Sequence, residues 1–235
     1  MVYKGVDSAC SGTGDIDTVA PKEDWDKIAE LFVAWARAEH LGPVAMCDHV
    51  PNVRHLVALD PASRFFFEMD VNCRKVFLGS TLFRPQDLHP LAWTDERGFS
   101  YLRPGATALM KLVQNGASRG GRPNWEGIRV KHVVEGLEAD PEGVVLGSEL
   151  FGSGAAALRE LAQAVVDGKW RRTAMLRVEA ACIRRSLREP DALLMRMKFR
   201  RVKRGCPLLV TVFEKGRDVG PDPDAWLAAV EQDHR

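Results

Sequence analysis

The sequence predicts an α+β fold, in which a small mixed β-sheet core is followed by a helical C-terminal region. Residues with the two-residue alternation of strands occupy 15–19, 53–59 and 64–71. One amphipathic helix, expected over residues 25–41, lies between the first two of these strands. From Pro104 onward, apolar residues instead recur at helical spacing between Gly, Pro and Asn. We therefore expect an α/β core over residues 1–103 and a mainly helical domain over residues 104–235.

Each element has local signals at its ends. The first strand opens out of the glycine turn of residues 11–14, and acidic residues after Pro21 favour the start of the first helix. A turn at residues 60–63 separates the second and third strands. Further helices are expected over residues 104–115, 124–139, 141–151, 155–167, 171–187 and 222–232. Residues 208–213 are apolar and β-branched, which fits either a strand or a buried helix.

Composition indicates a cytoplasmic protein without membrane partners. The 235 residues suffice for a sizeable core. No apolar run approaches the ~20 residues that a membrane span needs. The first residues also lack the apolar segment of a signal peptide. A P-loop kinase is excluded because the chain has no Gly-x-x-x-x-Gly-Lys-Ser/Thr motif.

The cysteines and histidines give only a weak metal signal. Five scattered cysteines, none spaced as Cys-x-x-Cys, argue against a disulfide framework or a zinc ribbon. Cys47, His49 and His55 lie near one another around Pro51, and Cys73 is the one available fourth ligand. Strand ends around a proline-containing turn are the favoured interpretation of this cluster.

Three carboxylates carry the functional hypothesis. Asp15 and Asp17 alternate along a strand, so they should present their oxygens on the same side. If the strand of residues 64–71 lies beside them, Asp70 or Glu68 adds a third oxygen donor. For Glu68 we favour a solvent-facing position on a half-exposed strand. Hard oxygen ligands of this kind suit Mg²⁺, which takes further ligands from substrate phosphates.

These residues resemble a known family. Gly5 precedes Gly14-Asp-Ile-Asp17 by about ten residues, and a helix and then Phe67-Glu-Met-Asp-Val71 follow. This order resembles the DNA polymerase β-like nucleotidyltransferase superfamily, and most of all its small bacterial members, such as the antibiotic nucleotidyltransferases. The resemblance covers residues 2–75. It implies that Asp15, Asp17 and Asp70 are catalytic residues that bind Mg²⁺.

Several other residues are candidates for binding the nucleotide. A glycine turn offers backbone amides to phosphates, and arginines on a glycine-rich loop can close over an anion. Lys111, on an otherwise apolar helix, would either reach phosphate oxygens or extend its ammonium group to solvent, and the second reading is slightly favoured. A mobile connector is an equally good interpretation of the arginine loop. The nucleotide-binding candidates are Gly5, Ser8, Ser11, Gly12, Lys111, Arg119 and Arg122.

The resemblance implies transfer of a nucleoside monophosphate from an NTP, most simply ATP, to a hydroxyl of an unidentified small molecule, protein or RNA. The alternative is a catalytically inactive relative that serves as a binding or regulatory protein, since Val6 follows Gly5 where the family usually has Ser or Gly. A third hypothesis assigns nucleic-acid binding to the basic run of residues 196–204. We do not favour it, because few aromatic residues accompany the run and the net charge is only +1.

Overall fold

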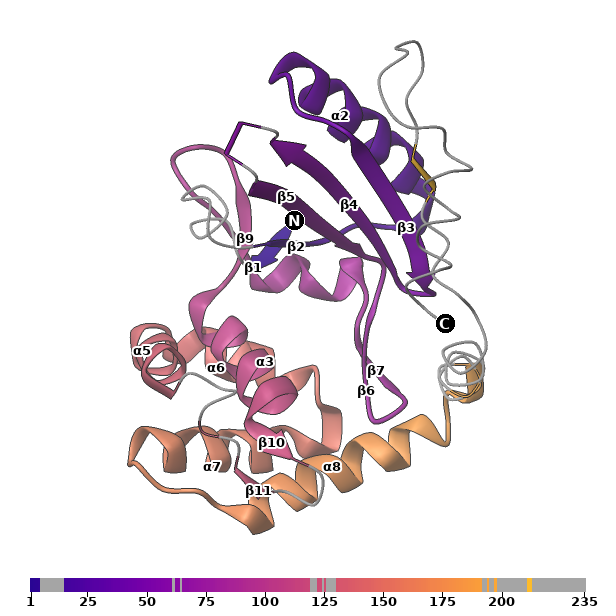
Figure 1. Ribbon diagram of the computed structural model, residues 1–235. Coiled ribbons are helices and arrows are strands. Elements are labelled where there is room, and N and C mark those ends of the chain that lie inside the picture. Colours follow the sequence, from indigo (N-terminus) through magenta and orange to yellow (C-terminus); the bar gives the residue numbers. More distant parts are fainter. Residues whose placement is uncertain are drawn as a thin grey trace, which may run out of the picture.

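The chain combines a β-sheet carrying one helix with a separate group of helices (Figure 1). This computed structural model describes residues 1–4, 15–60, 62–63, 65–118, 122–123, 125, 130–191, 194, 197 and 211–212. Its sheet mixes parallel and antiparallel pairs. One helix lies between the second and third strands of the chain, and the helices of the other group come between residues 104 and 186, after all the sheet strands except the last. The predicted α+β class is confirmed.

The sheet forms the upper half of the molecule in Figure 1. Within the described residues it has eight strands, in the order β12-β3-β4-β5-β2-β1-β9-β8. These strands are β1 (Val2–Lys4), β2 (Ile16–Val19), β3 (Val44–Val50), β4 (Val53–Asp60), β5 (Phe65–Asn72), β8 (Ala92–Thr94), β9 (Ser100–Leu102) and β12 (Thr211–Val212). Two-stranded pairs are formed by β6 (Lys75–Phe77) with β7 (Ser80–Phe83), and by β10 (Ala117–Ser118) with β11 (Arg122–Pro123).

Helix α2 (Trp25–Ala38) covers one face of the sheet, after the short helix η1 (Lys22–Asp24). Trp25, Phe32 and Ala36 of α2 pack against a row of buried sheet residues that includes Leu56 and Val71. Since side chains alternate along a strand, the neighbours of these sheet residues point to the opposite face. That opposite face carries the acidic residues of β2 and β5.

Several sheet elements were not expected from sequence. β3, β8 and β9 fall in segments without a clear alternation of apolar and polar residues, and they gain their hydrogen bonds from neighbouring strands. Of residues 208–213, the structure describes only Thr211 and Val212, and these two pair with β3 as a strand. Gly42 would readily supply the left-handed conformation that closes the first helix near residue 41, but in the structure His40 has the positive φ that follows the helix.

The helical half contains α3 (Pro104–Gly116), α5 (Val130–Ala139), α6 (Pro141–Glu149), α7 (Ala155–Val166) and α8 (Arg172–Ser186), with the short helices η2 (Pro85–Leu91) and η3 (Gly152–Gly154). Most of these helices lie close to the predicted ranges, but α5 is described only from Val130, whereas the predicted helix begins at residue 124. The helix predicted over residues 222–232 lies outside the described residues. Their core is built around the fully buried residues Leu109, Leu112 and Leu158 of α3 and α7. Val19 of β2 and Leu102 of β9 belong to the same core, so it extends across the boundary expected after residue 103. That boundary stays a prediction.

One buried carboxylate joins the starts of two helices. Asp140 precedes α6 and accepts a hydrogen bond from the Gly143 amide at 2.9 Å, and it accepts a second from the Gly105 amide of α3 at 3.1 Å. The Arg103 guanidinium donates to the same carboxylate at 2.6 Å. These contacts satisfy amides that helix starts leave without an intrahelical partner. Gly105 is required there, because a Cβ would lie 2.2 Å from the Asp140 carbonyl oxygen.

We expect Asp140→Asn to lower the free energy of unfolding by about 2–4 kcal/mol, since it leaves the charge of Arg103 without its main partner. Urea denaturation measures this loss. As a control, Glu142→Gln removes the other carboxylate bound to Arg103, whose side chain is 71% exposed. An exposed ion pair contributes less than about 1 kcal/mol, so equal losses in the two variants would contradict the assignment.

The Asp140 carboxylate should also make the free energy of unfolding depend on pH in the acidic range. Its hydrogen bonds to Arg103 hold the pKa of Asp140 below its usual range. The contribution of Asp140 is therefore complete above the unfolded-state pKa of about 4, and it is lost as the pH falls further toward the folded-state pKa. Between about pH 5 and pH 2, Asp140→Asn should show a flatter decline in stability than the unsubstituted protein. Equal slopes in pH-dependent denaturation would exclude this contribution.

Among the described residues, no helix has both the length and the apolar character required to cross a bilayer.

Candidate functional site

The acidic site depends on the pairing of β2 with β5. The two strands run parallel, and Asp17 lies opposite Asp70 in their register. Asp15 immediately precedes β2, two residues before Asp17. One carboxylate oxygen from each of Asp15, Asp17 and Asp70 lies within 4.8 Å of those of the others. The three residues that the sequence singled out are therefore neighbours, although more than fifty residues of chain separate Asp70 from the other two.

Backbone and side-chain contacts hold these two strands together. The Thr18 hydroxyl donates to the carbonyl oxygen of Asp70 at 3.0 Å. The Asn72 side-chain amide donates to the carbonyl oxygen of Thr18 at 3.3 Å. Val71 packs under α2, and Thr18 lies opposite it on the same face of the sheet. Asp17 and Asp70, each one residue earlier on its strand, therefore face away from α2. Asp17 is nearly enclosed, with 4% of its surface exposed.

The oxygen donors fit a magnesium site. Three carboxylates with oxygens this close supply hard, anionic ligands, and Mg²⁺ prefers such ligands to nitrogen or sulfur. Asp17 is buried and Asp70 is 18% exposed at its side chain, so water screens their charges poorly. A bound cation would compensate that concentrated negative charge.

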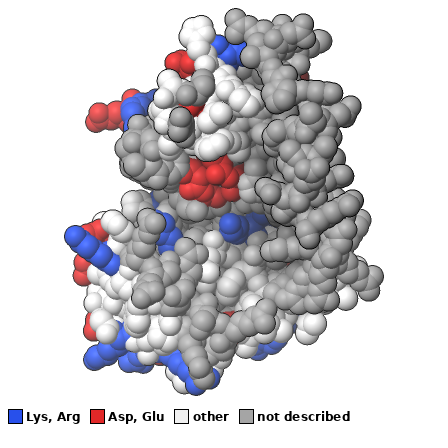
Figure 2. Space-filling view, in the orientation of Figure 1, with Lys and Arg blue, Asp and Glu red and all other residues white. Residues whose placement is uncertain are grey.

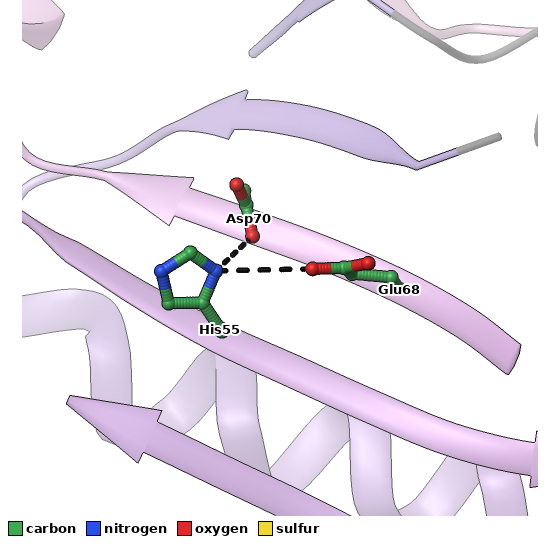
Figure 3. A group of neighbouring side chains, drawn as sticks. All are labelled: His55, Glu68 and Asp70. Atoms are coloured by element: carbon green, nitrogen blue, oxygen red, sulfur yellow. Dashed lines mark hydrogen bonds and ion pairs between the residues drawn. The ribbon is translucent and has the colours of Figure 1, made fainter. Parts of the chain in front are cut away.

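His55 and Glu68 extend the cluster along the same face of the sheet (Figure 3). His55 of β4 lies opposite Asp70 in the antiparallel register, with its Nδ1 atom 2.5 Å from Asp70 Oδ1. Glu68 of β5 lies 3.9 Å from the same Nδ1 atom, and its side chain is 46% exposed. His55, Glu68 and Asp70 form a second group whose ligand atoms lie within 4.8 Å of one another.

The cluster changes the proton affinity of two of its members. The hydrogen bond to Asp70 raises the pKa of the His55 imidazole. Partial burial, followed by the negative charges of Asp70 and Asp15, raises the pKa of the Glu68 carboxyl group. In both cases the negative charges of the neighbouring acids act in the same direction as these main causes.

The sequence reasoning missed His55 as a member of this site. Proximity in the sequence groups it with Cys47, His49 and Cys73, yet neither candidate metal group within the described part of the chain includes a cysteine. A stronger signal was available in the turn after Asp60. If Asp60 pairs with Phe65 across that turn, the antiparallel register continues one residue at a time along both strands, and it places His55 opposite Asp70. Glu68 is half exposed, as expected, but it belongs to the same cluster.

The nucleotide-binding candidates are placed only in part. Lys111 lies half-buried on α3 in the helical half. The backbone of Arg122 lies in β11. The remaining candidates, Gly5, Ser8, Ser11, Gly12 and Arg119, lie outside the residues that the structure describes. A role for any of these residues in binding phosphates stays a prediction.

The acids lie on the sheet face that is directed toward the helical half, since Val19, on the same side of β2 as Asp17, belongs to the helical core. Figure 2 shows acidic side chains gathered in a hollow between the two halves of the molecule, with basic side chains on its other side. A hollow with charges of both signs offers room for a substrate that carries phosphates together with cations.

Comparisons of the chain with protein-family models, with curated proteins and with solved structures found no match.

If repulsion among the acids is real, Asp15→Asn should stabilise the protein in the absence of divalent cations. Removing one charge within 4.8 Å of two others should raise the free energy of unfolding by about 1 kcal/mol at a partly screened site. Urea denaturation in a chelating buffer measures the effect, with Asp167→Asn as a control at an exposed helix end. Magnesium at about ten times its dissociation constant should stabilise the unsubstituted protein by about 1.4 kcal/mol. A less stable Asp15→Asn protein without metal would contradict the expectation.

Proposed function

We propose that the protein is a magnesium-dependent nucleotidyltransferase. It would transfer a nucleoside monophosphate from an NTP, most simply ATP, to a hydroxyl group of an acceptor molecule. The observation that carries the proposal is the convergence of the Asp15, Asp17 and Asp70 carboxylates within 4.8 Å on one face of the sheet. Phosphoryl and nucleotidyl transfer require acids in such an arrangement, because the reaction develops charge on oxygens that only cations can neutralise.

The order of residues along the chain supports the same proposal. The glycine-containing start, the Asp15-Ile-Asp17 pair and the later Asp70 resemble the DNA polymerase β-like nucleotidyltransferase superfamily. The resemblance requires the third acid to lie beside the first two, and the parallel pairing of β2 with β5 meets that requirement. An unrelated Asp-x-Asp pair on a surface strand would have no reason to have a third acid opposite it.

The chain's residues would divide the work by position. Asp15 and Asp17, two residues apart, would hold the cations that bind the triphosphate, and Asp70 would complete the site on the acceptor side. When bound, two Mg²⁺ ions would lower the pKa of the attacking hydroxyl and neutralise the leaving pyrophosphate. The acceptor oxygen would form a bond to the α-phosphorus as the α–β anhydride bond breaks, and the hydroxyl proton would pass to solvent. The sheet would keep the acids in place throughout, since Asp17 and Asp70 lie in its register.

The test is Mg²⁺-dependent release of pyrophosphate from labelled NTPs, with pools of small-molecule, protein and RNA acceptors. Asp15→Asn and Asp17→Asn should each lower the rate by roughly 10²–10³-fold, the typical cost of removing one group that stabilises transition-state charge. Asp167→Asn, which removes a carboxylate from an exposed end of α7, should retain the rate. Equal pyrophosphate release by the unsubstituted and the Asp15→Asn proteins would exclude catalysis at this site.

Calorimetry separates this proposal from an inactive binding or regulatory protein. A nucleotidyltransferase should bind an NTP more tightly with Mg²⁺ than without it, and Asp15→Asn should abolish the difference. An inactive relative should show no Mg²⁺-dependent affinity for NTPs.

A further inference from the structure

His55 is the one described residue from β4 in the acidic cluster. Its ring and the Asp70 carboxylate face each other across neighbouring strands, and each side chain is only 18% exposed (Figure 3). The Nδ1 to Oδ1 distance of 2.5 Å places the two side chains in direct contact across β4 and β5. Because an ionised carboxylate can only accept, the hydrogen must lie on Nδ1.

This contact limits how Asp70 can rotate. A carboxylate on a strand can turn about its terminal torsion, which is broad and has no strong preferred angle. The hydrogen bond from His55 occupies Oδ1 and so selects one orientation of the group. Neighbouring β2 then lies on one side of Asp70 and β4 on the other, since β5 is between them in the sheet. The orientation of Asp70 relative to Asp15 and Asp17 is therefore coupled to a residue on the far strand.

A shared cation between His55 and Asp70 fits the distance less well. Ligands of one Mg²⁺ lie about 2.0–2.1 Å from the ion, so adjacent octahedral ligands are about 2.9 Å apart. The 2.5 Å contact is shorter than that separation and shorter even than an ordinary N–H···O hydrogen bond, so the imidazole and the carboxylate are in direct contact with no room for an ion between them. Imidazole nitrogen is also a poorer ligand for Mg²⁺ than oxygen. Glu68, at 3.9 Å from Nδ1, is too far to replace Asp70 as the hydrogen-bond acceptor.

We propose that His55 is a positioning residue, which orients the Asp70 carboxylate so that it binds a divalent cation together with Asp15 and Asp17. The inference rests on the proposed function in one respect only, namely that these three acids bind the cation. His55 itself contacts neither the cation nor the nucleotide. Hydrogen bonds to metal-binding carboxylates typically change metal affinity or activity by 10–100-fold.

Three substitutions separate the roles of the two ring nitrogens. The amide of His55→Asn places a donor close to the position of Nδ1, and that of His55→Gln places it nearer to Nε2. His55→Leu keeps a side chain of similar size without any donor. The probe is Mn²⁺, a paramagnetic substitute for Mg²⁺, bound to the full chain in the absence of nucleotide and measured by electron paramagnetic resonance.

We expect the dissociation constant for Mn²⁺ to rise 10–100-fold in His55→Leu and in His55→Gln, and to stay within about threefold in His55→Asn. Melting temperatures without metal identify any loss of folding. If His55→Leu fails to fold, the comparison of Asn with Gln still decides the matter, because both are amides. His132→Asn, at an exposed histidine of α5, should bind Mn²⁺ as the unsubstituted protein does.

The outcomes distinguish the two proposals. If the unsubstituted protein binds no Mn²⁺, or if Asp15→Asn binds it equally well, the proposed function fails and the role of His55 fails with it. If Asp15→Asn loses Mn²⁺ while all three His55 variants retain it, only the positioning role is wrong. A nitrogen coupling in the Mn²⁺ spectrum that disappears in His55→Leu would show that His55 is itself a ligand, and this too would overturn the positioning role.

Discussion

The parallel register between β2 and β5 is the constraint on which the rest of the site depends. Asp17 lies opposite Asp70 because Thr18 lies opposite Val71, and Val71 is fully buried beneath α2. A slip of one residue would turn Asp17 toward that apolar layer and Thr18 toward the acids, since side chains alternate from face to face. Burial of an unpaired carboxylate costs several kcal/mol. The apolar packing on one face of the sheet therefore fixes the arrangement of charge on the other.

This arrangement concentrates negative charge on a part of the sheet where water screens the charges of Asp17 and Asp70 poorly. Asp17 and Asp70 come from strands that are joined by backbone pairing and by the side chains of Thr18 and Asn72. Partial burial raises the pKa of the Glu68 carboxyl group, and the neighbouring acids raise it further. A site of this kind is costly to the folded protein in the absence of a ligand, and binding sites commonly trade stability for function in this way. The cost makes sense if a cation occupies the site during activity.

The helical half contributes the other side of the hollow and is built on different principles. Its core is continuous with the sheet through Val19 and Leu102, so the two halves share buried residues as well as a chain connection. Asp140 links the starts of α3 and α6 by accepting from both Gly105 and Gly143. Glycine is needed where these helices meet, because a side chain at Gly105 would collide with the backbone before α6. The helical half is thus held together by contacts that do not involve Asp15, Asp17 or Asp70.

The sequence by itself determined the class of fold and most of the helices after Pro104, because the spacing of apolar residues and the positions of Gly, Pro and Asn are local signals that need no tertiary contacts. It also singled out Asp15, Asp17 and Asp70 as candidate site residues. It also indicated that Asp15 and Asp17 share a face, which follows from the geometry of a strand alone. Only the tertiary structure decided that β5 lies directly beside β2, which brings Asp70 to them. The tertiary structure also places His55 beside Asp70, through a strand pairing that composition does not reveal. β3 and β12 likewise form as strands through hydrogen bonds to neighbouring strands. The physical reason is that pairing between distant strands is selected by burial over the whole sheet, and no short stretch of residues contains that information.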